Sequence, residues 1–360
     1  MNDLTRKFGR FLAVSSLSLL ALGSFAHQAA AGLPKSALGA IAVSPDGKTI
    51  AAAGDNRVLY LLDADTLDVR ERIWIKLSPM SLFWTKDGKT LVMQHTDDVL
   101  ALLDTSTWEQ RGEIPKFNKI SFAPQSEMVV TAVQGERNDD HYKTILRVHD
   151  LNTGKMLKEN ELDYEIVSIA TTPDASRTVI ATKEVDNEAE AKVDPAADLK
   201  DIEKETAQKK GDGKTMDFAW FDSDLKETAR ITSWYSTYYT DGLHLHDGKT
   251  YLLSYGTSAV ISENGDAELF QSYGPNTSYG YGFTADNSTM ISGGLSSGTL
   301  FDIASRTETN FDLGERLPGW PEYIQGVTVA PDGTIIGGTS AYRVMKMSPD
   351  GKVELVKPVF

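Results

Sequence analysis

The chain has 360 residues, a formal net charge of −15 and no cysteine. The absence of cysteine excludes a disulfide framework, thiol catalysis and cysteine-bound metal or lipid, so the fold must be held together by its apolar core. The negative charge disfavours binding to nucleic acid and to anionic lipid headgroups. Proteins and small molecules are therefore the expected partners.

The first residues have the pattern of a secretory signal peptide. A basic start precedes an apolar stretch of about 16 residues, Phe11 to Ala26, which is short for a membrane span of roughly 20 residues. Small residues up to Ala31 then offer a cleavage site before Gly32, and a cut after Ala26 is the alternative. We expect residues 1–31 to be removed on export and residues 32–360 to form the folded protein in the periplasm, with no membrane span left. A retained anchor is the less favoured interpretation.

One phrase recurs along the rest of the chain: an apolar strand, a tight turn and a second apolar strand. Its first copy reads Ala40-Ile-Ala-Val-Ser-Pro-Asp-Gly-Lys-Thr-Ile. Proline presets φ in such a turn, aspartate bonds the local backbone and glycine takes the left-handed position. The aligned turn positions are Asp46, Asp87, Gln125, Asp174, Asp247, Asp286 and Asp332. Each copy continues with a third and a fourth strand, and four strands in a period of about 40 residues predict a propeller blade.

Seven blades fit the chain, beginning near residues 38, 77, 116, 165, 238, 279 and 324. An eighth blade in the long interval after Asp174 is the alternative, but a charged segment without strand pattern fills that interval. The series begins with a first strand and ends with a fourth, Val353-Glu-Leu-Val-Lys. We therefore expect the ring to close by packing between the first and last blades, without a borrowed strand.

The phrases Val43-Ser-Pro-Asp-Gly-Lys-Thr-Ile and Leu61-Leu-Asp-Ala-Asp-Thr-Leu resemble those of the YVTN-type and WD-repeat-like propeller superfamily. This resemblance covers most of the chain and implies an all-β, single β-propeller without bringing any catalytic residue. The blade arrangement is also loosely similar to the cofactor-free propeller subunit of quinohaemoprotein amine dehydrogenases. The Gly-His and Trp-Asp dipeptides of true WD repeats are absent.

Two insertions are expected between second and third strands. The smaller is Gly135 to Lys143, and the larger runs over about residues 186–214 in blade four. The larger predicts a helix, with Asp194 as N-cap, Pro195 in the first turn and Gly211 at the end. Its apolar stripe is narrow, so the helix should dock lightly on the rim or project. A solvated charged excursion is the alternative.

The loops between the later blades are rich in tyrosine and tryptophan, which combine a large apolar area with a polar tip. In a propeller these loops emerge on the same face as the insertions. We predict a ligand- or partner-binding face there, although packing between blades would explain some of its members. The candidate residues are Trp234, Tyr235, Tyr238, Tyr239, Tyr279, Tyr281, Trp320 and Tyr323.

Two short motifs raise chemical alternatives. His244 and His246 share one face of a strand and are weak candidates for metal ligands, but two ligands do not make a site, and we expect structural histidines. Gly294-Leu-Ser-Ser-Gly298 matches the G-x-S-x-G pattern, which has catalytic meaning only on a strand-to-helix elbow. Here it lies between two predicted strands, so a hairpin turn is the simpler interpretation.

No set of residues in the sequence forms a credible catalytic centre, and none calls for a cofactor. We therefore expect a non-catalytic periplasmic propeller that binds a protein partner or small ligand through its aromatic, insertion-bearing face. The alternative is an enzyme or enzyme subunit, such as the propeller subunit of a periplasmic quinoprotein-type dehydrogenase or a lactonase-like hydrolase. Convergent acidic and histidine side chains at the mouth of the central channel would favour that alternative.

Overall fold

A computed structural model describes residues 38–95, 97–123, 125–138, 141–182, 185–186, 201–235, 242–253, 255–273, 281–284, 288–314 and 321–360. The predicted signal peptide and the predicted N-cap Asp194 lie outside these ranges, so their structures stay predictions. Within the described ranges, no helix has the length and apolar character needed to cross a bilayer.

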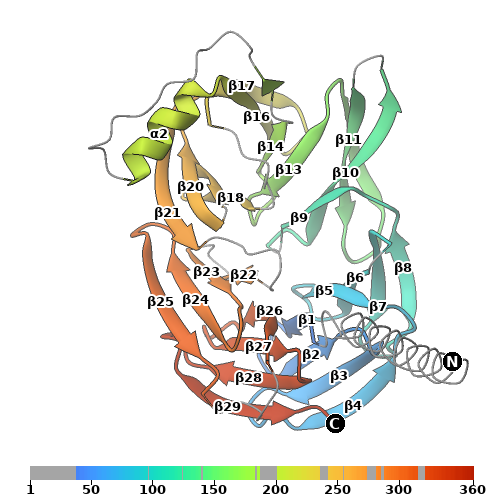
Figure 1. The fold of residues 1–360 in the computed structure, drawn as a ribbon. Coiled ribbons are helices and arrows are strands. Elements are labelled where there is room, and N and C mark those ends of the chain that lie inside the picture. Colours follow the sequence, from blue (N-terminus) through green and yellow to red (C-terminus); the bar gives the residue numbers. More distant parts are fainter. Residues whose placement is uncertain are drawn as a thin grey trace, which may run out of the picture. The chain divides into compact units, whose positions relative to one another are not determined.

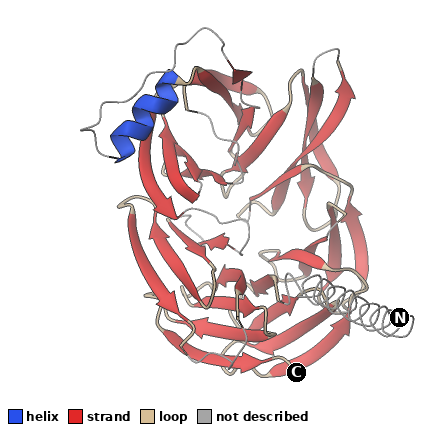
Figure 2. Ribbon diagram, viewed as in Figure 1, coloured by secondary structure: helices blue, strands red, loops and turns tan. Residues whose placement is uncertain are grey.

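Seven antiparallel sheets follow one another in chain order and form a ring, as the sequence predicts (Figure 1 and Figure 2). Each sheet uses four consecutive long strands, and the fourth sheet gains one short strand. The first three blades are built from β1 (Ala40–Val43), β2 (Thr49–Ala53), β3 (Val58–Asp63), β4 (Val69–Trp74), β5 (Pro79–Trp84), β6 (Thr90–His95), β7 (Val99–Asp104), β8 (Gln110–Ile114), β9 (Lys119–Ala123), β10 (Met128–Arg137), β11 (Tyr142–Asp150) and β12 (Met156–Leu162).

The last four blades contain the one described helix. Their elements are β13 (Ile166–Thr171), β14 (Arg177–Thr182), β15 (Val185–Asp186), α2 (Asp201–Gly211), β16 (Lys214–Asp222), β17 (Glu227–Ser233), β18 (Gly242–His246), β19 (Lys249–Leu253), β20 (Tyr255–Ile261), β21 (Ala267–Tyr273), β22 (Tyr281–Phe283), β23 (Thr289–Ser292), β24 (Ser297–Asp302), β25 (Thr307–Asp312), β26 (Ile324–Val329), β27 (Ile335–Thr339), β28 (Arg343–Met347) and β29 (Val353–Pro358).

The turn between the first and second strands follows the chemistry of the repeated phrase. In blade one, Ser44 Oγ donates to Asp46 Oδ1 over 2.6 Å, and the same oxygen accepts the backbone N–H of Lys48 over 3.1 Å. Gly47 takes the left-handed φ of 73° that a larger side chain would resist. The predicted roles of Asp46 and Gly47 in this turn are confirmed here.

A second repeated feature is the turn between the third and fourth strands. In every blade one residue of this turn has a positive φ: Leu67, Trp108, Gly154, Leu225, Gly265, Arg306 and Gly351. The turn lies against the preceding blade. A Cβ on Gly265 would come within 2.3 Å of the carbonyl oxygen of Thr232, and Asn160 Nδ2 donates to the carbonyl of Leu225 over 2.9 Å. Neighbouring blades are therefore joined by a recurring contact at their outer strands.

Among the strands that the structure describes, none is exchanged between the first and last blades. The first blade contains β1 to β4 only and the last contains β26 to β29 only, as the sequence predicts. Apolar side chains of the two blades, including Ile50, Leu62, Ile336 and Val344, form one buried cluster. Packing between blades therefore closes the ring.

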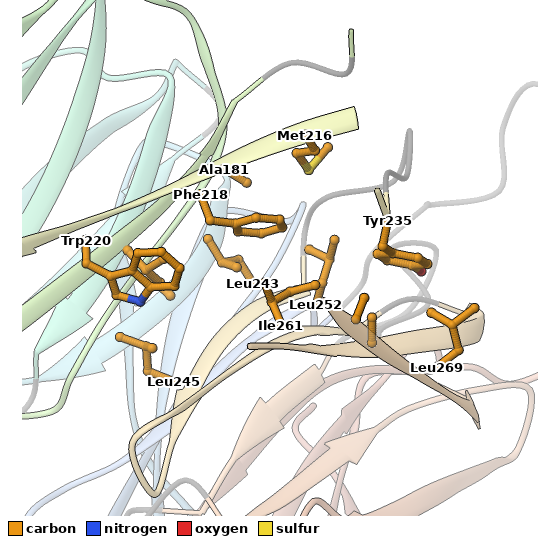
Figure 3. Close-up of a cluster of buried hydrophobic side chains, with 14 residues drawn as sticks. Ala181, Met216, Phe218, Trp220, Tyr235, Leu243, Leu245, Leu252, Ile261 and Leu269 are labelled. Atoms are coloured by element: carbon orange, nitrogen blue, oxygen red, sulfur yellow. The ribbon is translucent and has the colours of Figure 1, made fainter. Parts of the chain in front are cut away.

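The largest buried cluster lies between blades four and five (Figure 3). Phe218 and Trp220 of β16 face Leu243 and Leu252 of blade five, and all four are at most 7% exposed. Each buried aromatic side chain of this kind is worth about 3–5 kcal/mol against alanine. The apolar alternation that identifies the strands in the sequence therefore supplies the surfaces that hold adjacent blades together.

Both predicted insertions differ in detail from a simple loop. The smaller one extends a hairpin, because β10 runs to Arg137, which pairs with Tyr142 of β11. The larger one begins with β15, which prolongs the edge of β16, and contains α2, which ends at Gly211 as predicted. The helix follows β15 in the connection from β14 to β16, but it packs against β21 of blade five.

Candidate functional site

The candidate site is the face that carries the insertions, here called the insertion face. Because adjacent strands run in opposite directions, the connection from second to third strand and the connection from one blade to the next leave the sheet on the same side. Helix α2 and the extended β10–β11 hairpin belong to these connections, and so do seven of the eight predicted aromatic positions; the eighth, Tyr281, begins β22. The insertion face is therefore where long connections and aromatic residues coincide.

Trp234 and Tyr235 follow the outermost strand of blade four. The indole Nε1 of Trp234 donates to Asp266 Oδ1 of blade five over 2.8 Å, and the hydroxyl of Tyr235 donates to the carbonyl of Thr257 over 3.1 Å. The two rings meet edge to face with centroids 6.3 Å apart. Both side chains are thus held in fixed orientations by residues of the next blade.

Helix α2 covers this aromatic pair. Lys210 Nζ lies 4.6 Å from the ring centroid of Trp234, and Lys209 Nζ lies 4.9 Å from that of Tyr235. Thr257 Oγ1 donates to Glu205 Oε2 of the helix over 2.5 Å. Tyr235 is only 1% exposed as a result of this and the surrounding core. The predicted docking of the helix on the rim is observed, and Tyr235 presents no open ring surface while the helix is in place.

Asp266 places a negative charge beside Trp234. The indole N–H of Trp234, the backbone N–H of Ala267 and the nearby Lys210 ammonium all favour the ionised carboxylate, so the pKa of Asp266 lies below its usual value. Lys210 Nζ lies 3.9 Å from Asp266 Oδ1. An aromatic face beside a fixed carboxylate is an arrangement suited to binding an ammonium group.

Tyr323 lies between blades six and seven, where the chain enters β26. It forms an isolated backbone bridge with Leu295, which belongs to the connection from β23 to β24 and is 50% exposed. The backbone N–H of Tyr323 donates to Ser340 Oγ over 2.9 Å. Leu295 and Tyr323 are therefore neighbours on the insertion face, fixed by backbone contacts on both sides.

A buried ion pair anchors this position. Glu322 is fully buried, and its carboxylate accepts hydrogen bonds from Thr339 Oγ1 (2.6 Å), Arg343 Nε (2.9 Å) and Arg343 Nη2 (2.5 Å). Its carbonyl oxygen accepts the backbone N–H of Ser296 over 2.7 Å and the Ser296 hydroxyl over 2.9 Å. The five hydrogen bonds fix the backbone from which Tyr323 emerges.

Five of the predicted positions have no described side chain. Tyr238, Tyr239, Tyr279 and Trp320 lie outside the described residues, and Tyr281 is described only as the first backbone position of β22. The prediction that all eight aromatics share one binding surface stays a prediction. Of the remaining three, Trp234 and Tyr235 are close together, and Tyr323 belongs to a different pair of blades.

The two candidate metal ligands lie close to the next blade. The ring of His244, which is 6% exposed, stacks on Phe283 of blade six with centroids 4.0 Å apart. His246 is close enough to Asp302 to contribute to a lowered pKa of that carboxyl, after the larger effect of Ser305. The described part of the chain holds no group of three or more His, Asp or Glu side chains that could enclose a metal ion.

Gly294, Leu295 and Ser296 lie in the hairpin connection between β23 and β24, as expected from the flanking strands, and Ser297 and Gly298 begin β24. The serine at the nucleophile position of the motif, Ser296, has a φ of 56° and is 2% exposed. Its hydroxyl donates to the backbone of Glu322. This hydrogen bond of the buried Ser296 hydroxyl joins blade six to the start of blade seven.

Several residues of the face carry no functional signal in the sequence. Glu322 and Arg343 are separated by 21 positions, and neither belongs to a recognisable motif. Lys209 and Lys210 are explained by the helix dipole alone, which favours basic residues in the last turn. Their contact with an aromatic pair becomes visible only once the helix is placed on blade five.

No family model matches this chain, and no curated protein matches it. The seven-bladed fold agrees with a WD-like or YVTN-like propeller and is compatible with a binding or scaffold role.

Proposed function

We propose that this protein is a non-catalytic binding propeller that recognises a partner protein through its insertion face. The observation that carries the proposal is the fixed backbone of Leu295 and Tyr323 beside the buried Glu322–Arg343 pair. An exposed apolar side chain on a backbone that is already fixed loses less conformational entropy on binding than one on a mobile loop. Tyrosine and neighbouring apolar residues are typical of the positions that dominate protein interfaces.

The repeated turn also supports membership of the YVTN-type and WD-repeat-like superfamily, whose propellers display binding surfaces on a common scaffold. The loose likeness to the propeller subunit of quinohaemoprotein amine dehydrogenases is compatible with a role inside a larger complex. We propose the periplasm as the location, on the basis of the signal-like residues 1–31. Cell fractionation and the mass of the processed N-terminus test this, with processing before Gly32 or after Ala26 as the expected results and an unprocessed cytoplasmic chain as the contrary one.

The binding proposal is tested by co-purification of tagged protein from its native cells. The double variant Leu295→Ser, Tyr323→Ala should fold normally and lose the partner that the unchanged protein retains. The matched control is Leu157→Ser, which removes an apolar side chain of similar exposure (44%) from the outer strand β12. Circular dichroism and thermal unfolding establish that each variant is folded. Retention of every partner by the folded double variant would contradict the proposal.

A further inference from the structure

The corner formed by Trp234, Tyr235 and Asp266, here called the aromatic corner, already binds two ammonium groups. Lys210 contacts both the indole ring (4.6 Å) and the Asp266 carboxylate (3.9 Å), while Lys209 lies 4.9 Å from the phenol ring. Ring faces attract cations through their quadrupole, and the carboxylate adds a full charge. The corner therefore has the chemistry of a receptor for adjacent lysines.

The corner is built by residues other than those of the helix that occupies it. Trp234 follows β17 of blade four, Asp266 lies in the turn between β20 and β21, and the hydrogen bond between them (2.8 Å) does not involve the helix. Tyr235 is likewise held by the carbonyl of Thr257. These contacts can persist when the lysines leave, so the receptor is preorganised.

The two lysine contacts of the helix with the corner are of the kind that solvent and salt weaken, and the hydrogen bond from Thr257 to Glu205 is a further contact of the helix. The side chains of Lys210 and Asp266 are 52% and 61% exposed. Exposed ion pairs and exposed cation–aromatic contacts are individually weak. Ile202 packs at the margin of the apolar cluster and is only half-buried. The contacts of Lys209 and Lys210 are therefore ones that a competing segment could also make.

We propose that the aromatic corner is a recognition site for a paired-lysine segment of a partner protein, and that α2 is an autoinhibitory occupant of it in the free protein. The inference rests on the proposed binding function and adds the chemistry of the partner. The net charge of −15 attracts basic segments over a distance, which agrees with this choice of partner. A partner segment engages when its two lysines replace Lys209 and Lys210.

The direct test uses a synthetic peptide of residues 201–212, which carries both lysines, and a second peptide in which both are glutamine. Binding is measured by fluorescence anisotropy to the full chain and to the variant Lys209→Ala, Lys210→Ala. The variant should bind the lysine peptide at least about tenfold more tightly than the unchanged protein, because the cis competitor has lost its own contacts. The glutamine peptide should bind neither protein, and added salt should weaken the lysine peptide.

Three further variants assign the effect to the corner. Trp234→Leu or Asp266→Asn, each added to the double lysine variant, should abolish or reduce peptide binding. Lys204→Ala is the matched control, since it removes a lysine from the same helix, and it should leave peptide affinity unchanged. Hydrogen exchange supplies a measurement on the folded protein itself: amides of α2 should exchange faster in the double lysine variant, while those of β16 and β20 keep their protection.

Equal peptide affinity for the unchanged protein and the folded double lysine variant would overturn the inference. Binding of the lysine peptide that persists after Trp234→Leu is added to the double lysine variant would also overturn the inference. The proposed function is tested separately, at Leu295 and Tyr323 between blades six and seven. If partner capture depends on those two residues while the lysine peptide binds nowhere, the inference fails and the binding function stands. If the peptide binds as expected while the variant Leu295→Ser, Tyr323→Ala keeps its partners, the lysine site stands and the role given to Leu295 and Tyr323 fails.

Discussion

The ammonium of Lys357 donates a hydrogen bond of 2.7 Å to the carboxylate of Asp68, and this contact joins the last strand of blade seven to a turn of blade one. The same kind of contact recurs at other seams of the ring. Lys158 of β12 donates to Asp224 of blade four over 2.6 Å. The closing seam therefore uses the contact that joins consecutive blades, although its residues are 289 positions apart.

We expect Lys357→Met to lower the thermal midpoint of unfolding slightly at low salt, with a smaller difference from the unchanged protein at 1 M salt, where the Debye length is about 3 Å. Lys357 lowers the pKa of Asp68, so this contribution is present above the ordinary value of 3.8 and is lost as the pH falls through the lowered pKa. Differential scanning calorimetry at two salt concentrations measures the effect. Lys352→Met, in the preceding turn, is the control and should show a smaller salt-dependent difference, because its charged neighbour Asp350 lies in the same turn.

Acid should destabilise the ring through its turn aspartates. Asp174 accepts hydrogen bonds from Thr172 and Ser176, which lower its pKa from 3.8 to about 2. A lowered folded-state pKa stabilises the fold above pH 3.8, and that contribution is lost as the pH falls toward 2. Asp174→Asn should lower the thermal midpoint of unfolding at pH 7. On acidification, the midpoint of the variant should fall less than that of the unchanged protein, as measured by thermal unfolding between pH 2 and 7. If the midpoints of the two proteins fall in parallel as the pH is lowered, the ionised Asp174 carboxylate does not stabilise the fold in this way.

Arg343→Met should be strongly destabilising, because it leaves the buried Glu322 carboxylate without its charged partner. Such a loss costs about 3–5 kcal/mol. Replacing both residues, as Glu322→Leu with Arg343→Met, should recover part of the loss, since no uncompensated charge remains. Chemical denaturation measures both variants, with Arg137→Met on the exposed β10–β11 hairpin as the control. A double variant no more stable than Arg343→Met alone would contradict this explanation.

Gly242 should not tolerate a methyl group. A Cβ at this position would lie 1.9 Å from the carbonyl oxygen of Leu253 on the paired strand, so the backbone would have to move. Gly242→Ala should reduce the free energy of unfolding by about 1–3 kcal/mol or prevent folding. Gly112→Ala is the control, because its nearest neighbour would be 3.6 Å away. Equal stability of the two variants would disprove the steric explanation.

Most of the ring could be predicted from the sequence because a blade is a local object. The turn at Asp46 and Gly47 needs only the residues beside it, and the apolar alternation of the flanking strands repeats with the same period. The end of α2 at Gly211 is equally local. Seven such units give the architecture without knowledge of any long-range contact.

The contacts of the insertion face are not local, and the sequence did not predict them. The burial of Glu322 depends on Thr339 and Arg343 in the following strands. The cover over Tyr235 comes from a helix that belongs to blade four by connection and packs on blade five. The local sequence around an aromatic loop residue is therefore the same whether a helix covers that residue or leaves it exposed.

Each described blade is built from strands that are close together in the sequence, and this has a consequence for the order of folding. In a ring closed by strand exchange, one sheet waits for a strand from the far end of the chain. Here blade one has four strands within Ala40–Trp74, so its hairpins can pair before the last blade has folded. Contacts within a blade have low sequence separation and form quickly. Only the seam between blades seven and one depends on the complete chain, so the final step of assembly is the docking of two finished sheets.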